Sequence, residues 1–187
     1  MHQTDRLNPF DGLTDCKAVW HTLLQRAQSL IGPSALIAGA YEPPTGRLTV
    51  EAALGLGSIM DEFLMLSGHQ VLGWSAVVPD KAKPFLLSGR LHIVPGGLQD
   101  LVFGQLPRGL ARWLEELWNV PTIYSIGLVH NGELFGVLDF ALREGGGLDR
   151  AEELSTLAGQ CAAALAALRA GNRNGMEPAV GLEPTTT

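Results

Sequence analysis

The spacing of apolar residues predicts a helix near each end of the chain. Between residues 15 and 31, apolar side chains recur every three or four positions, and Thr14 or Asp15 can cap this helix. A second regular stretch starts near Asp149 and ends at Gly171. The residues outside these limits lack periodicity. We therefore expect a flexible lead-in (1–13), one domain (14–170) and a disordered tail (171–187).

Alternating and turn-forming residues predict two hairpins between these helices. The first joins residues 34–41 to 47–54 around a Gly-containing turn, and the second joins 122–130 to 133–142. The second hairpin turns at Asn131-Gly132, a pair that accepts positive φ at both turn positions. The order of elements predicts an α+β domain in three layers with a central antiparallel sheet.

The stretch between the hairpins is rich in glycine and proline and reads as an irregular crossover. It contains helix candidates at 59–66 and 107–119, a short helix that Asp80 can cap, and short strand candidates at 74–78 and 91–94. We expect the terminal helices to cover one face of the sheet and this loop-rich crossover the other. A sheet under such a layer is a natural place for a ligand pocket.

Composition excludes several classes of protein. With 46% hydrophobic and 17% charged residues among 187, the chain reads as a folded domain rather than a disordered one. A net charge of −6 argues against a nucleic-acid partner. No apolar run is long enough to span a membrane and the N-terminus lacks a signal-peptide core, so we expect no membrane partner and a cytoplasmic location.

Metal and disulfide chemistry find little support in the sequence. Cys16 and Cys161 are the only cysteines, too few for a disulfide scaffold or a structural zinc site. The five histidines include no pair spaced by four residues, so a zinc-binding helix motif is absent and no metal site is expected.

Three stretches of the chain carry a family resemblance. They are LGWSAVVPDKAKPFLLSGRLHIVPGGLQDLVFGQLPRGL in the crossover, the hairpin SIGLVHNGELFGVLDFAL and the closing helix LDRAEELSTLAGQCAAALAAL. Together they resemble a GAF domain, the small-molecule-sensing module of many signalling proteins. The resemblance spans residues 15–170, and the sequence is similar to GAF segments of bacterial and archaeal sensor histidine kinases. It implies a non-enzymatic regulatory domain that binds a ligand between sheet and crossover and relays the change through its terminal helices. Because no output segment accompanies it, we expect a separate signalling output protein as a partner.

The family's specialised ligands fit this sequence poorly. It lacks the Asn-Lys-Phe-Asp-Glu constellation of cyclic-nucleotide binders and has no cysteine beside a histidine in the crossover for a bilin. We expect an unidentified small molecule, neutral or weakly anionic, and no required cofactor. Three alternatives stay open. They are a haem or redox sensor with His92 or His69 as axial ligand and Cys16 as attachment, a free-methionine sulfoxide reductase, and a ligand-free dimerisation scaffold.

The candidate ligand-binding residues come from the crossover, its long helix and the last hairpin. They are Trp74, Phe85, Arg90, His92, Trp113, Tyr124 and Asp139. Each aromatic residue also fits an ordinary core position, and His92 also fits an ordinary surface or core histidine. Asp139 interrupts an apolar strand, where a buried carboxylate needs a partner. It either faces the pocket to meet a ligand donor or faces solvent.

The closing helix also suggests a homodimer. A seam with three- and four-residue spacing runs along it, formed by Leu154, Leu157, Cys161, Ala164 and Leu168. We expect this seam to meet a second copy of the chain in a four-helix bundle. Ala158 and Leu165 would then serve the contact with the first helix. The alternative is that the alanine-rich faces simply tolerate water.

Overall fold

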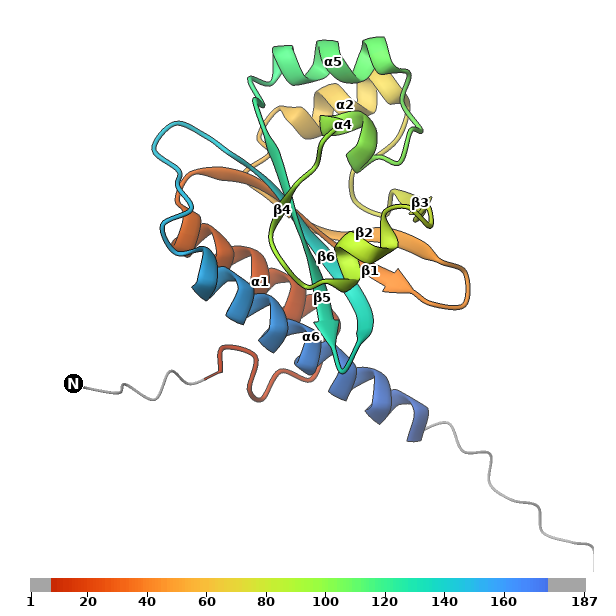
Figure 1. Cartoon of the computed structure of the whole chain (residues 1–187), viewed down its shortest axis with the longest axis vertical. Helices are drawn as coiled ribbons and strands as arrows, with labels where there is room; N and C mark the ends of the chain where they lie inside the picture. Colours follow the sequence, from red (N-terminus) through yellow and green to blue (C-terminus); the bar gives the residue numbers. More distant parts are fainter. Residues whose placement is uncertain (1–7, 175–187) are drawn as a thin grey trace, which may run out of the picture.

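The chain folds around a six-stranded sheet, and the computed structural model describes residues 8–174 (Figure 1). In chain order the elements are α1 (Cys16–Ile31), β1 (Ser34–Glu42), β2 (Arg47–Leu54), α2 (Ile59–Ser67), β3 (Ser75–Val77), α3 (Lys83–Leu87), β4 (His92–Ile93), α4 (Gly97–Leu101), α5 (Arg108–Leu117), β5 (Ile123–His130), β6 (Glu133–Leu142) and α6 (Ala151–Asn174). The predicted helices and hairpins are all present.

The sheet is antiparallel, with strand order β3-β2-β1-β6-β5-β4. The two predicted hairpins, β1–β2 and β5–β6, lie side by side, and β1 pairs with β6 at the centre. The second hairpin turns as expected, with φ of 50° at Asn131 and 79° at Gly132. The short strands β3 and β4 come from the crossover and add one strand at each edge.

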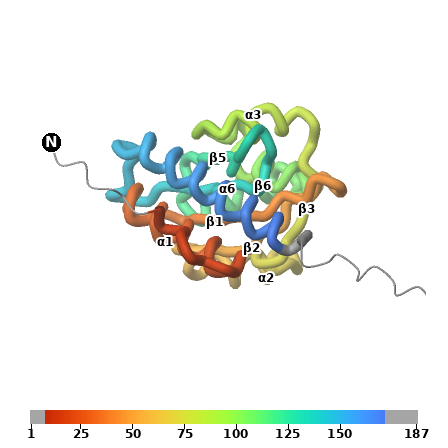
Figure 2. Tube along the Cα trace, turned by 90° about the horizontal axis from the view of Figure 1, so that it is seen from below, coloured from red at the N-terminus to blue at the C-terminus, as the bar shows by residue number. Residues whose placement is uncertain are grey.

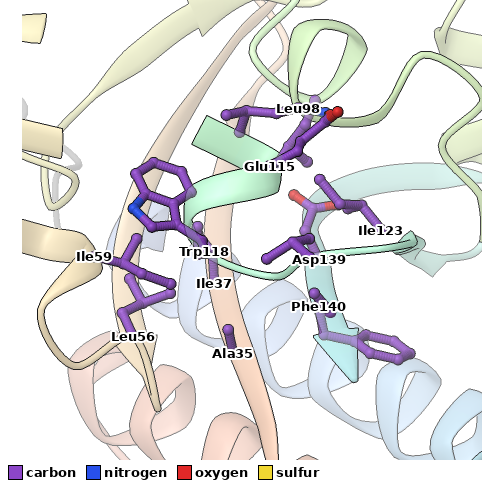
Figure 3. A pocket seen from close by; sticks show the side chains of 13 residues that line it. Ala35, Ile37, Leu56, Ile59, Leu98, Glu115, Trp118, Ile123, Asp139 and Phe140 are labelled. Atoms are coloured by element: carbon purple, nitrogen blue, oxygen red, sulfur yellow. The ribbon is translucent and has the colours of Figure 1, made fainter. Parts of the chain in front are cut away.

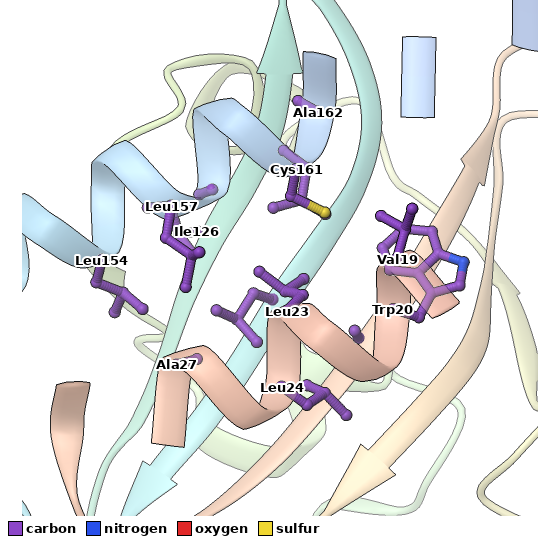
Figure 4. Packing of buried hydrophobic residues seen from close by; sticks show 14 of the residues in the cluster. Val19, Trp20, Leu23, Leu24, Ala27, Ile126, Leu154, Leu157, Cys161 and Ala162 are labelled. Carbon is purple, nitrogen blue, oxygen red and sulfur yellow. The ribbon is translucent and has the colours of Figure 1, made fainter. Parts of the chain in front are cut away.

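Helices α1 and α6 cover one face of the sheet and lie side by side (Figures 1 and 2). Asp15 caps α1 by accepting hydrogen bonds from the backbone N–H groups of Lys17 and Ala18. Side chains of both helices fill the space against the sheet (Figure 4). This cluster is the largest block of buried apolar side chains in the described part of the chain, so it anchors the domain.

The crossover covers the opposite face. Alternation along β1 separates the two sides, because Leu36 and Ala38 face the helices while Ala35 and Ile37 face the crossover. Helices α2, α4 and α5 pack around a second core at one end of the sheet, and α3 lies directly on β5. The chain is therefore a three-layer α+β domain, as the order of elements predicted.

The structure corrects the predicted dimer seam. Leu154, Leu157 and Cys161 are each at most 5% exposed and belong to the core between α6, α1 and the sheet, so they cannot meet a second chain. Ala164 and Leu168 are half-buried against the same core. The residues of the predicted seam contact α1 and the sheet of their own chain, as do Ala158 and Leu165. A wide face of α6 is therefore buried within the domain.

The ends of the chain and one cap also differ from expectation. Phe10, in the expected lead-in, is buried in the main core, and α6 continues past Gly171 to Asn174. Residues 1–7 of the expected lead-in and 175–187 of the expected tail lie outside the described residues. Asp80 does not cap α3 but forms an ion pair with Lys83. Within residues 8–174, the helices are all too short or too polar to traverse a bilayer.

Candidate functional site

A cavity of about 550 Å³ lies between the sheet and the segment that carries α3, β4 and α4. Strands β2, β5 and β6 form its floor, through Leu48, Ser125, Val137 and Asp139. The crossover supplies its walls, with Phe85, Leu86 and Phe103 among the apolar side chains. The cavity thus occupies the place where the sequence predicted a ligand.

Two smaller cavities of about 70 Å³ each open beside the first, toward the second core. Asp139 and Leu101 line all three spaces, so these residues mark where the cavities meet. The smaller cavities are otherwise almost entirely apolar, with Ile37, Leu56 and Trp118 among their walls. Figure 3 shows Asp139 at one of them with its carboxyl group turned inward, whereas the neighbouring Phe140 turns away toward the helices.

Asp139 is the buried ionisable group of this site. Only 7% of it is exposed, and its carboxyl group accepts a hydrogen bond from the hydroxyl of Ser125, which lies directly opposite on β5. Burial removes the carboxylate from water and raises the pKa of Asp139 from 3.8 to about 7, and the Ser125 hydroxyl opposes part of this rise. Among the described residues, no cation contributes to this pKa. Near neutral pH the group can therefore exist with or without its proton.

Two glutamates hold the roof of the smaller cavities in place. The carboxylate of Glu115 on α5 accepts a hydrogen bond from the backbone N–H of Leu98 in α4. Glu62 on α2 accepts one from the indole N–H of Trp118, with 2.7 Å between nitrogen and oxygen. These bonds tie α4 and α2 to the α5 region, so polar contacts cross-link the walls of the cavities.

Polar groups of the crossover surround the mouth of the large cavity. Lys81, Arg108 and Asp100 are exposed there, and His92 is half-buried with its ring 5.8 Å from that of Phe85. The Asp100 carboxylate accepts a hydrogen bond from the backbone N–H of Gly96. The cavity is therefore mostly apolar, with a carboxyl group at its floor and charges of both signs at its mouth.

The predicted ligand residues divide into three groups. Phe85, His92 and Asp139 line the large cavity, and Trp74 lines a smaller one. Arg90 and Trp113 are exposed and lie outside the lining of all three cavities. Tyr124 lies on the other face of the sheet, where its ring stacks on Phe140 with 5.3 Å between centroids.

Sequence reasoning missed Ser125, Leu101 and Glu115. A regular β5–β6 ladder counted back from the turn would place Tyr124 opposite Asp139. A bulge between Leu128 and Val129 shifts the register by one residue and brings Ser125 there instead. Opposite residues of an antiparallel pair share a face, so the bulge sends Ser125 to the cavity and Tyr124 to the helices.

The cysteines and histidines considered for haem, redox or metal chemistry are not gathered at the cavity. Cys16 is exposed on α1 and Cys161 is buried on α6, both on the helix side of the sheet. His69 is exposed and does not line the cavities, whereas His92 does. Among the described residues, no three His, Cys, Asp or Glu side chains are grouped so as to hold a metal ion.

Comparison with known proteins identifies the fold. Neither family models nor curated protein sequences match the chain. Among solved structures, it is similar to a GAF domain/HD domain protein from Geobacter sulfurreducens, with 19% identity, a TM-score of 0.60, and coverage of 86% of this chain and 98% of that one. The GAF domain of a phosphoenolpyruvate-protein phosphotransferase from Coxiella burnetii has 16% identity and a TM-score of 0.60, covering 88% and 90%. The PixJ GAF domain of Thermosynechococcus elongatus in its blue-light absorbing form has 17% identity and a TM-score of 0.56, covering 86% and 90%. The six-stranded sheet, the paired terminal helices and these similarities show that this chain has the fold of a GAF domain.

Proposed function

We propose that this chain is a regulatory domain that binds a small molecule in the large cavity and passes the change to its terminal helices. The observation that carries the proposal is the cavity of about 550 Å³ with a single buried carboxyl group at its floor. A closed core would be filled by side chains, and an isolated buried carboxyl group is costly unless something offsets it. The solved structures with this fold include domains of signalling proteins, which agrees with a sensory role.

The route to the terminal helices runs through the sheet. Asp139 and Phe140 are neighbours on β6 and point to opposite faces, one into the cavity and the other into the core under α1 and α6. A ligand that shifts β6 therefore acts on both sides of the sheet. Near its C-terminal end α6 is attached by Arg169, whose guanidinium donates to the carbonyl oxygen of Tyr41 and lies 4.6 Å from the ring centroid of Phe135. A protein bound to α6 would respond to a displacement of this helix.

The homodimer that we propose for such a relay must use another face of α6. Periodicity places Thr156, Ala163, Ala167 and Ala170 opposite the buried stripe. These side chains are small and exposed or half-buried, so a second helix can approach closely. The separate output protein proposed from the sequence would bind either this same face of α6 or the surface next to it.

Native mass spectrometry of the purified protein tests ligand binding directly, because a molecule carried in the cavity is released on denaturation and can be identified. A thermal-shift screen of metabolites complements it. Leu101→Trp places a large side chain where the three cavities meet and should abolish ligand-dependent stabilisation. Leu64→Trp on the exposed side of α2 is the matched control and should leave it intact. No carried molecule and no stabilisation of the wild type would refute the proposal.

A further inference from the structure

The chemistry of the cavity floor restricts the ligand further than the fold does. The floor holds one carboxyl group, Asp139, surrounded by apolar walls and by the hydroxyl of Ser125. The lysine and arginine of the cavity lining, Lys81 and Arg108, are exposed at its mouth and do not contribute to the pKa of Asp139. A ligand that reaches the floor therefore meets a carboxyl group that lacks a positive partner.

We propose that the cavity takes a compact, largely apolar organic amine whose ammonium group pairs with the carboxylate of Asp139. This inference rests on the proposed function, since it names the class of molecule that occupies the same cavity. It also changes the expectation from the sequence of a neutral or weakly anionic ligand. When Asp139 is ionised, a carboxylate ligand would face repulsion at the floor, and a neutral ligand would leave the charge of Asp139 unbalanced.

Geometry supports the pairing of one amine with Asp139. An ammonium group has three N–H donors, and a carboxylate can accept from more than one donor while retaining the bond from Ser125. The charge-assisted bond forms in a space shielded from water, where such bonds are strongest. The apolar walls, which include Leu48, Leu86 and Val137, suit the hydrocarbon part of the ligand. Glu115, which lines a neighbouring smaller cavity, already accepts a hydrogen bond from the backbone N–H of Leu98.

The protonation of Asp139 gives the proposal a second signature. Below neutral pH, burial keeps Asp139 protonated in most molecules of the ligand-free protein. Asp139 must therefore lose this proton before its carboxylate can pair with an ammonium group. Amine binding should strengthen as pH rises through the range where Asp139 ionises. The other titratable or charged groups that line the same cavities are His92 on β4, Glu115 on α5, Asp100 on α4, and Lys81 and Arg108 at the mouth. Asp139→Asn separates their titration from that of Asp139.

Matched probes that differ only in one polar group provide the test. Benzylamine, benzyl alcohol and benzoate are titrated into the full chain, with binding followed by backbone amide chemical shifts in NMR spectra. We expect the amine to bind about tenfold or more tightly than the alcohol, the benefit of one charged hydrogen bond, and benzoate to bind weakest. Asp139→Asn should reduce the preference for the amine to about unity while the alcohol still binds. Asp61→Asn removes an exposed carboxylate on α2, outside the three cavities, and should preserve the preference.

The outcomes separate this inference from the proposed function. Equal binding of amine and alcohol, a preference that survives Asp139→Asn, or failure of all three probes to bind would overturn the amine assignment. In each of these cases native mass spectrometry still decides whether the cavity carries a molecule. A carried molecule without a basic nitrogen refutes the inference alone. An amine affinity that rises with pH in the wild type but not in Asp139→Asn supports it.

Discussion

The side chains of Asp139 and Ser125 face each other across the β5–β6 ladder, and the Ser125 hydroxyl is the hydrogen-bond donor to a carboxyl group that is otherwise surrounded by apolar residues. The pair lies at the centre of the sheet face that the crossover covers. Because Asp139 is buried, a change in its charge alters the stability of the fold as well as the electrostatics of the cavity.

Replacement of Asp139 by asparagine should make stability less dependent on pH. The pKa of Asp139 is about 7 in the folded chain against 3.8 as the ordinary value, so the folded state holds a proton that the unfolded state has lost. The resulting stability is fully present below pH 3.8 and is lost as the pH rises through about 7. Between about pH 5 and pH 8.5, the wild type should lose about 3 kcal/mol of unfolding free energy that Asp139→Asn retains.

Urea denaturation across this pH range measures the effect for both proteins. Glu51→Gln, which removes an exposed carboxylate from β2, is the control and should follow the wild type. A wild type whose stability is flat or rises between these pH values would contradict the assignment of a raised pKa to Asp139.

Loss of the Ser125 hydroxyl should raise the pKa of Asp139 further, because this hydrogen bond favours the charged form. Ser125→Ala should also cost about 1 kcal/mol of stability. The carboxyl carbon of Asp139, followed by NMR spectroscopy during a pH titration, reports the pKa. Ser29→Ala on the exposed side of α1 is the matched control, and it should leave that titration unchanged. A pKa that stays the same or falls in Ser125→Ala would exclude the bond.

Gly127 should be intolerant of substitution because α3 lies against it. A Cβ atom at this position of β5 would collide with the backbone carbonyl of Leu86, which cannot move without shifting α3 from the sheet. Gly127→Ala should therefore destabilise the protein by about 2 kcal/mol or more and disturb the cavity wall that α3 forms. Gly159→Ala, in the exposed part of α6 with free space around it, should instead stabilise by about 0.5–1 kcal/mol.

Thermal unfolding of the two alanine variants compares them directly. Equal stability of both would mean that the close approach of α3 to β5 is absent in solution. A destabilised Gly127→Ala that retains the ligand response of the wild type would show that the wall formed by α3 does not shape the cavity.

The local patterns were sufficient to predict the helices and strands except α4, but not the details of strand pairing. Alternation and the Asn131-Gly132 turn identified the second hairpin within a residue of its observed bounds. The bulge between Leu128 and Val129 could not be read from them, because nothing in their side chains distinguishes a bulge from a regular pair. This one-residue shift decides that Ser125, not Tyr124, lies beside Asp139. The composition of the site therefore depends on the register of the β5–β6 pair, which the sequence pattern alone does not determine.

The predicted dimer seam failed for a related reason. Three- and four-residue spacing shows that one side of α6 is buried but does not say what buries it. Leu157 and Cys161 meet α1 and the sheet of their own chain because both terminal helices share one face. Exposed residues such as Arg90 and Trp113 could not be told from cavity residues either, since the path of an irregular crossover depends on contacts far apart in the sequence.

A homodimer formed through the outer face of α6 should depend on Ala163. This residue lies opposite the buried stripe, so a second α6 could pack against it closely. Ala163→Glu introduces a charge there, and glutamate keeps nearly the helix propensity of alanine. Light scattering of the wild type should give a mass near twice the 19.9 kDa of one chain, and the variant should return to one chain with unchanged thermal stability. Gln25→Glu, exposed on α1, adds a charge elsewhere on the helical layer and should leave the dimer intact. A wild type that stays near 19.9 kDa at high concentration would show that the domain works as a monomer, and its helices would then act on a different partner.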